Sequence, residues 1–330
     1  MVDLFERGDL LCGTSSASTK LLHGGLRYLE SGHIRLVREA LRERAWWLAN
    51  VPEHTAPIPL LLPIYRGRGR PRWILKLGLW LYDRLAGPAN IARHRWLGAD
   101  SLRERAPELS PDGLLGAYLF YDGQMDEPAL GAWVARQAAS AGVRLRTGEA
   151  VCRIDTGGAL RTVQGTYRFD RIVNAAGAWA VRLLQDSGIE SAVQLDHVRG
   201  SHLIVERAPA NGYLLQIPNE RRIFFVLPYR GRTLLGTTEV RQTLDEPVVC
   251  GAEEMEYLIR AYNAHFRRPL AADDVVETFA GLRSLIGSAE DPRRSSREYL
   301  VERRGALVNV YGGKWTTARA LGRKVADQCA

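Results

Sequence analysis

The chain has 330 residues, 46% of them hydrophobic, which is enough to bury a large core and to form two domains. Its net charge of +8 suits an anionic substrate or an anionic membrane surface, and we expect no nucleic-acid partner because no helix-turn-helix, zinc-finger or RNA-binding pattern is visible. Four scattered cysteines without a C-x-x-C pair exclude a zinc site and a disulfide framework, and they fit a reducing compartment.

The first predicted element is a short strand, 2–5, followed by the carboxylate of Glu6. In a dinucleotide-binding βαβ unit this is the second strand, whose terminal acid hydrogen-bonds the adenosine ribose, so Glu6 is a cofactor-binding candidate. The first strand and its G-x-G-x-x-G turn belong upstream, and no displaced copy of that turn follows. Two explanations are open. Either the start of the reading frame is assigned too late or the chain has been trimmed, or the protein has lost cofactor binding. We expect the chain as written to be unstable alone, since neighbouring strands lack a partner.

The most informative segment is the run 13–30, GTSSASTKLLHGGLRYLE. Its small residues and Gly-Gly pair leave a bare backbone, against which a flat ring or a diphosphate can lie. The run resembles the signature of FAD-dependent glycerol-3-phosphate dehydrogenases, G-T-S-S-x-S-T-K-L-x-H-G-G-L-R-Y-L-E, and matches it at every fixed position. The resemblance implies that FAD is the cofactor and that its contacts here include Thr14, Ser15, Ser16, Thr19, Lys20, Gly24 and Gly25.

The next elements are a helix over 34–49, a proline-bounded apolar segment over 58–64 that reads as an edge strand, and a basic loop followed by an apolar, Trp-bearing helix. Residues 66–85 hold this loop and helix, which is too short to span a bilayer. Two interpretations are open: a peripheral contact with a membrane interface, or a core helix that covers the substrate site. We expect a cytoplasmic protein, located at the inner face of the cell membrane if the helix docks there.

From residue 133 to 179, helices and strands alternate as in a parallel sheet, with a polar hairpin over 161–168. Beyond residue 194 the pattern indicates a mostly antiparallel sheet, then a helix over 253–265 and a closing strand, Gly-Gly turn and helix. By resemblance to two-domain flavoproteins, further cofactor contacts are expected in three places. Val151 lies where the backbone meets the adenine, and the turn after the strand 170–174 contributes Ala175, Ala176 and Gly177. The closing motif contributes Gly312, Gly313, Lys314, Trp315 and Thr316.

These elements and the resemblance predict an α/β (α+β) fold of the D-amino-acid-oxidase type. A Rossmann-like parallel FAD-binding sheet, without its first βα unit, accompanies a mostly antiparallel substrate domain. We assign residues 1–48, 127–200 and 286–330 to the FAD-binding domain, and 49–126 and 201–285 to the substrate domain. A helical C-terminal domain found in many family members is absent from the sequence.

The resemblance also assigns the substrate site. A phosphate dianion is best bound by guanidinium and ammonium donors, for which Arg27, Arg283 and Lys314 are the candidates, with Tyr28 as a neutral donor. Arg283 and Lys314 are also catalytic candidates, since a cation stabilises a developing alkoxide.

His23 and His202 are alternative catalytic bases, because an imidazole titrates near neutrality. Glu239 either positions a substrate hydroxyl or pairs with an arginine. It replaces the family's usual Asp, and Ser284 replaces a Pro.

The implied function is oxidation of sn-glycerol 3-phosphate to dihydroxyacetone phosphate, with hydride transfer to FAD N5 and electron transfer to a membrane quinone. One alternative is a related FAD-dependent oxidase of an amino or hydroxy acid that uses oxygen. The other is a flavin-free remnant with a binding role only. The sequence leaves open whether the protein is a monomer or a homodimer.

Overall fold

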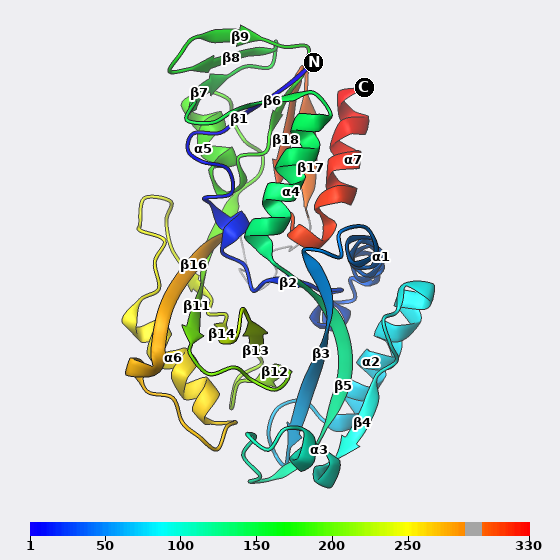
Figure 1. The fold of residues 1–330 in the computed structure, drawn as a ribbon. Coiled ribbons are helices and arrows are strands. Elements are labelled where there is room, and N and C mark those ends of the chain that lie inside the picture. Colours follow the sequence, from blue (N-terminus) through cyan, green and yellow to red (C-terminus); the bar gives the residue numbers. More distant parts are fainter. Residues whose placement is uncertain (288–298) are drawn as a thin grey trace.

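The computed structural model describes residues 1–287 and 299–330, and the chain forms two halves that share one long axis (Figure 1). The upper half of that view contains both termini and small sheets flanked by helices, and the lower half contains one large sheet. Part of the predicted FAD-binding segment 286–330, residues 288–298, lies outside the described residues. The domain boundaries stay a prediction.

The upper half carries the predicted parallel strand pairs. Strand β1 pairs in parallel with β6, β10 pairs in parallel with β18, and a separate antiparallel sheet contains the predicted hairpin. The elements of this half are β1 (Val2–Phe5), α4 (Glu127–Ser140), β6 (Val143–Arg146), β7 (Val151–Ile154), β8 (Ala159–Thr162), β9 (Thr166–Arg168), β10 (Ile172–Asn174), α5 (Ala180–Asp186), β17 (Leu300–Arg304), β18 (Leu307–Tyr311) and α7 (Ala318–Cys329).

Helix α4 begins six residues before the predicted start at residue 133. Asp126 is its N-cap, and the Asp126 side chain accepts a hydrogen bond from the backbone N–H of Ala129 at 3.3 Å. A proline in the first turn adds a second start signal, because its missing N–H needs no partner there. The sequence prediction was too short because it followed the apolar pattern and overlooked this cap.

The lower half is a mostly antiparallel sheet, as predicted, with β12 and β3 as the one parallel pair among its described strands. Its order is β15-β11-β14-β13-β12-β3-β5-β2, with β16 paired to β11 and β4 paired to β5. The elements are β2 (Leu21–Leu22), α1 (Ile34–Asn50), β3 (Thr55–Tyr65), α2 (Arg72–Ala86), β4 (Arg95–Gly98), α3 (Ala99–Arg105), β5 (Leu114–Met125), β11 (Leu195–Val205), β12 (Gly212–Gln216), β13 (Ile223–Tyr229), β14 (Arg232–Gly236), β15 (Val240–Arg241), α6 (Ala252–Asn263) and β16 (Val275–Ile286).

Strand β3 is a central strand, so the prediction of an edge strand over 58–64 was wrong. Its prolines, Pro57, Pro59 and Pro63, lie at alternate positions and therefore remove N–H groups from one side of the strand only. Pairing with β5 continues along the whole strand, whereas pairing with β12 is confined to Leu60 and Leu61. The sheet thus accommodates the prolines because β3 makes only a short hydrogen-bonded pairing with β12.

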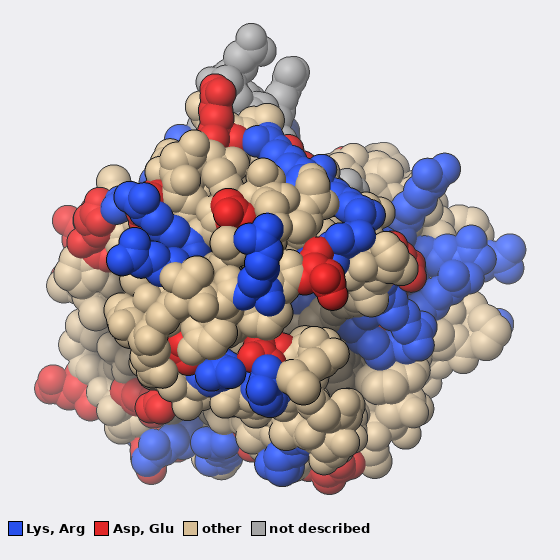
Figure 2. Space-filling view, turned by 90° about the horizontal axis from the view of Figure 1, so that it is seen from above, with Lys and Arg blue, Asp and Glu red and all other residues tan. Residues whose placement is uncertain are grey.

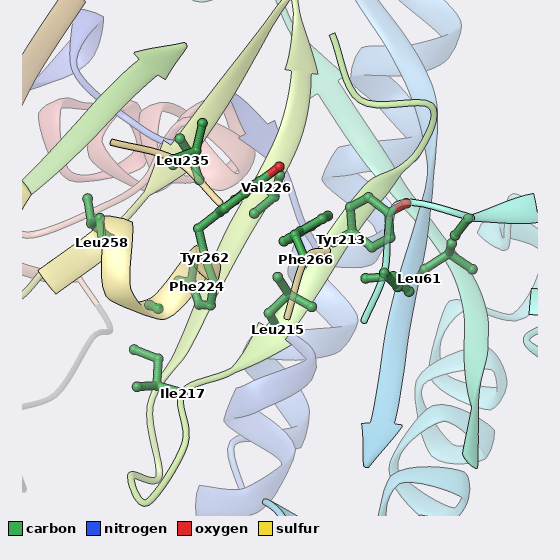
Figure 3. Packing of buried hydrophobic residues seen from close by; sticks show 14 of the residues in the cluster. Leu61, Tyr213, Leu215, Ile217, Phe224, Val226, Leu235, Leu258, Tyr262 and Phe266 are labelled. Carbon is green, nitrogen blue, oxygen red and sulfur yellow. The ribbon is translucent and has the colours of Figure 1, made fainter. Parts of the chain in front are cut away.

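Alternate residues of the large sheet face two separate cores. Leu61, Tyr213 and Phe224 pack beneath α6, where Tyr262 and Phe266 stack with ring centroids 4.0 Å apart (Figure 3). The other set, including Leu60, Leu62 and Phe120, packs against Leu41 of α1 and Leu79 of α2. The sheet is therefore held between α6 on one face and the α1–α2 pair on the other.

A buried polar network joins the α1–α2 pair to the sheet. Asp122 of β5 accepts hydrogen bonds at Oδ1 from Arg44 Nη1 of α1 at 2.7 Å and from the Tyr82 hydroxyl of α2 at 2.6 Å. The backbone N–H of Gly24 lies 3.1 Å from the same oxygen and 2.8 Å from the Tyr82 hydroxyl. Burial and the Asp122 charge raise the pKa of Tyr82 well above its usual value, so this hydroxyl stays protonated and donates.

We predict that Arg44→Met lowers the free energy of unfolding by about 3–5 kcal/mol, because it leaves the Asp122 carboxylate buried without its counter-ion. Chemical denaturation measures the change. The matched control is Arg103→Met, which breaks the exposed Arg103–Asp100 pair and should leave stability unaltered. Equal stability of the two variants would contradict a structural role for the network.

Candidate active site

The two halves meet around a cavity of about 800 Å³, the junction cavity. Its upper wall comes from the turns after β10 and β18, and its lower wall includes Phe120, Leu214 and Phe225 of the large sheet. The signature segment runs along it from one half to the other, since β2 within that segment pairs with β5. The site is therefore built between the two halves, from segments distant in sequence.

Most of the predicted site residues line the junction cavity. They come from the signature segment, from the turn after β10, from the end of the large sheet and from the Gly-Gly motif: Thr14, Ser15, Thr19, His23, Gly25, Arg27, Tyr28, Ala175, Gly177, Glu239, Arg283, Gly312, Gly313, Lys314, Trp315 and Thr316.

The other predicted residues lie behind the wall or away from it. Glu6 accepts a hydrogen bond from the Gly8 N–H at 3.1 Å, and Val151 opens β7 and packs on the core of the upper half. Ser16 donates to the Gly13 carbonyl at 3.1 Å, and the Ala176 N–H donates to Asn174 at 3.4 Å. Lys20, Gly24 and His202 are also absent from the described cavity lining.

Lys20 supports the wall from behind. Its ammonium group is buried in an ion pair with Glu127 of α4 and also donates to the Ser16 carbonyl at 2.6 Å. Glu127 in turn accepts from the Ser18 N–H at 3.3 Å. The pair thus holds the backbone of residues 16–18, whose neighbours line the cavity.

Gly24 sits at a position with no room for a side chain. A Cβ there would lie 2.3 Å from Leu41 Cδ2 and 2.4 Å from the Tyr82 hydroxyl. The next residue, Gly25, has φ +76°, a left-handed conformation that L side chains rarely adopt. The Gly-Gly pair therefore lets the chain pass close to α1 and α2, and so directs His23 and Arg27 to the cavity.

One side of the cavity carries cationic side chains. Arg283 donates from Nη2 to the Thr237 hydroxyl at 2.8 Å, and Lys314 Nζ lies 4.0 Å from the Tyr28 ring centroid. Gly200 makes room for the guanidinium, since a Cβ there would lie 2.3 Å from Arg283 Nη2. Together with Arg27, these groups place three positive charges along the cavity, the kind of donors that an anionic ligand requires.

Glu239 pairs with arginines, one of the two roles that the sequence left open. Its carboxylate lies 3.7 Å from Arg283 Nη1 and 3.6 Å from Arg222 Nε. Arg222 also donates to the Tyr257 hydroxyl at 3.1 Å. Arg222 was not among the predicted site residues, because it lies just before β13 outside any recognised motif, and only the fold brings it next to Glu239.

Two indole hydrogen bonds anchor the Gly-Gly motif, one to the signature segment and the other to helix α1. Trp315 Nε1 donates to the Ser15 carbonyl at 2.8 Å, and Trp47 Nε1 donates to the Thr316 carbonyl at 3.1 Å. The Thr316 hydroxyl also accepts from the backbone N–H of His23 at 3.2 Å. Trp47 was missed as a site residue, since its apolar position in α1 indicates only a core side chain.

The wall of small residues fits a flavin. Thr14, Ser15, Gly312 and Gly313 present backbone and hydroxyl groups with little side chain, as a planar ring requires. Gly281 keeps this wall close to the sheet, because a Cβ there would lie 2.6 Å from the Ala17 carbonyl. These residues would hold the ring, and the cationic groups stand beside it.

Comparison with known proteins gives the family. Residues 1–328 match the family described as FAD dependent oxidoreductase (DAO). The chain belongs to this family. Its membership confirms the predicted two-domain flavoprotein fold and FAD as the cofactor, and it makes the chain an oxidoreductase.

The curated relatives include glycerol-3-phosphate dehydrogenases, as the signature predicted. The glycerol-3-phosphate dehydrogenase of Pseudomonas aeruginosa is 36% identical over 99% of this chain and 66% of its own length. The D-erythritol 1-phosphate dehydrogenase of Brucella abortus is 37% identical over 98% of this chain and 67% of its own length. This chain therefore spans about two thirds of the length of these relatives.

A solved structure with the same fold contains the expected cofactor. The glycerol-3-phosphate dehydrogenase from Bacillus halodurans, complexed with FAD, superposes with a TM-score of 0.77 at 25% identity, covering 99% of this chain and 59% of that one. The L-alpha-glycerophosphate oxidase from Mycoplasma pneumoniae, at 16% identity and a TM-score of 0.78, supports the fold.

We predict that Gly24→Ala weakens FAD binding, because the added methyl group pushes the signature segment away from Leu41 and Tyr82. Fluorescence titration of FAD measures the dissociation constant, which should rise about tenfold or more for a displacement costing over 1.4 kcal/mol. The control is Gly13→Ala in the same segment, where a Cβ meets nothing within 4 Å. Unchanged FAD affinity in Gly24→Ala would show that the close approach is irrelevant to the cofactor site.

Proposed function

We propose that this chain oxidises sn-glycerol 3-phosphate to dihydroxyacetone phosphate. The observation that carries the proposal is the cationic group Arg27, Arg283 and Lys314, which lines the same cavity as the wall of small residues and bare backbone. The names of the Pseudomonas and Bacillus relatives support the same substrate. A second candidate substrate is D-erythritol 1-phosphate, named for the Brucella relative, which would present the same phosphate to the same cations.

The residues of the chain have separate tasks in this reaction. Arg27, Arg283 and Lys314 bind the phosphate dianion, with Tyr28 as a further donor. Bound FAD supplies a two-electron acceptor for the hydride of the secondary alcohol, and a membrane quinone is the proposed final acceptor. His23 accepts the hydroxyl proton, since it lines the cavity near Tyr28, with ring centroids 6.3 Å apart. The cations stabilise the oxygen as its proton leaves.

The test is the visible spectrum of the FAD-loaded protein under anaerobic conditions. We predict that glycerol 3-phosphate bleaches the flavin band, whereas glycerol and glycine, which lack the phosphate, do not. Arg27→Met should raise the substrate concentration for half-bleaching at least tenfold, since a charge-assisted hydrogen bond contributes about 1.5–3 kcal/mol. Bleaching by glycine instead would favour the amino-acid oxidase alternative, and no bleaching by any phosphate ester would contradict the proposal.

A peripheral membrane contact through α2 is the second part of the proposal. Within the described residues no helix is long and apolar enough to cross a bilayer. Helix α2 buries Leu79 and Tyr82 on one face, while Trp73, Leu77 and Trp80 on the other are 68%, 57% and 53% exposed. Exposed aromatic and leucine side chains on one helix face are typical of an interfacial helix.

Positive charge surrounds this apolar face. The basic loop 66–72 precedes it, Lys76 and Arg84 are exposed within α2, and α1 exposes Arg35, Arg38 and Arg42. Figure 2 shows Lys and Arg gathered at the right of that view, the side on which Figure 1 has α1 and α2. An anionic lipid surface would attract this side, and the inner face of the cell membrane is the proposed location.

We predict that the protein co-sediments with vesicles containing anionic lipid and that the triple change Trp73→Ser, Leu77→Ser, Trp80→Ser lowers the partition coefficient at least tenfold. Each large apolar side chain withdrawn from water contributes about 1.5–3 kcal/mol. The control, Val163→Ser, alters a valine that is 69% exposed in the turn between β8 and β9. If the triple variant and the control bind vesicles equally, α2 is not the membrane contact.

A further inference from the structure

His202 lies in the layer behind the cavity wall. It belongs to β11, is 1% exposed and is not among the described residues that line the junction cavity. Thr19, which does line the cavity, stands in front of it, and His202 Nε2 lies 2.9 Å from the Thr19 hydroxyl. The imidazole therefore reaches the cavity through Thr19.

The surrounding strands hold the ring in one orientation. His202 is directly opposite Gly236 of β14 and Phe279 of β16. The Phe279 ring stacks on the imidazole with centroids 4.7 Å apart and an interplanar angle of 11°. On the other side, a Cβ at Gly236 would lie 2.2 Å from His202 Cδ2, so only glycine leaves room for the ring.

The charge state also disfavours a direct proton-transfer role. Burial and the positive charges of Arg283 and Lys20 hold the pKa of His202 well below its usual value. A neutral imidazole with so low a pKa takes up a proton poorly near neutrality. His202 is thus neutral, rigid and linked to the cavity by one hydrogen bond.

We propose that His202 is a positioning residue that fixes the Thr19 hydroxyl toward the bound flavin, and that it is not the base of the reaction. In either neutral tautomer the Thr19 hydroxyl makes one hydrogen bond with His202 Nε2. The hydroxyl donates when Nε2 carries no proton and accepts when Nε2 is protonated. The hydroxyl can then no longer rotate freely, and its other hydrogen-bonding positions stay available to a ligand in the cavity that Thr19 lines. The inference rests on FAD binding from the proposed function, but not on the identity of the substrate.

The test is a double-mutant cycle with FAD affinity and the flavin absorption spectrum as readouts. Thr19→Val removes the hydroxyl, and His202→Phe keeps a ring to pack on Phe279 while removing the nitrogen. Each should weaken FAD binding about three- to tenfold, the effect expected for one hydrogen bond, and shift the flavin band. The double variant should bind no more weakly than either single variant, because both act on one interaction. Thr19→Ser, which keeps the hydroxyl, should restore the wild-type values.

A second buried histidine provides the control. His265 is 3% exposed, burial lowers its pKa to about 4, and its Nε2 lies 2.9 Å from the Gln216 carbonyl, outside the described cavity lining. His265→Phe should leave FAD affinity and the flavin band at wild-type values.

Three results would overturn the inference: no FAD binding by the wild-type chain, additive effects in the double variant, or a His202→Gln variant that binds FAD with an unaltered spectrum yet no longer reduces it. The first two remove the positioning role, and the third would identify His202 as the base. The first two results use FAD affinity and the spectrum alone, so they are independent of whether glycerol 3-phosphate bleaches the flavin. The third is read only with a substrate that bleaches the flavin of the wild-type chain.

Discussion

One carboxylate oxygen joins the large sheet and the helices α1 and α2 to the signature segment. Arg44 of α1, Tyr82 of α2 and the backbone N–H of Gly24 all donate to Asp122 Oδ1 inside the protein. Because a buried carboxylate needs these donors, the two helices, the strand and the loop cannot move apart independently. His23 and Arg27 are within three residues of Gly24, so their entry into the cavity depends on this constraint.

The cavity depends on contacts that join opposite ends of the chain. The indole of Trp315 bonds to Ser15 and that of Trp47 to Thr316, which brings the Gly-Gly motif and the signature segment to one wall. The cations occupy the neighbouring side. A planar cofactor and an anionic substrate would thus meet at a boundary between a nearly neutral backbone surface and a positive one, which suits hydride transfer from a phosphorylated alcohol.

A second layer of buried polar groups supports that wall. Lys20 and Glu127 hold the backbone at residues 16–18, and His202 holds Thr19. Glu254 of α6 accepts hydrogen bonds from Thr238, Ser201 and Arg199. Burial alone would raise the pKa of the Glu254 carboxyl, but these hydrogen bonds lower that pKa below its usual value. Titratable residues inside a family motif are therefore not all in contact with the ligand, and some act by fixing those that are.

The sequence by itself determined the family and the cofactor, and most of the residues that it singled out line the junction cavity, because the signature and the Gly-Gly motif are local patterns whose backbone requirements are carried by adjacent residues. Tertiary structure decided which motif residues face the cavity: His23 and Thr19 do, whereas Lys20, Gly24 and His202 lie behind it. It also decided the central place of β3, the pairing of Arg222 with Glu239, and the convergence on Asp122. These depend on strand order and on side chains far apart in the chain, and no local pattern encodes such contacts.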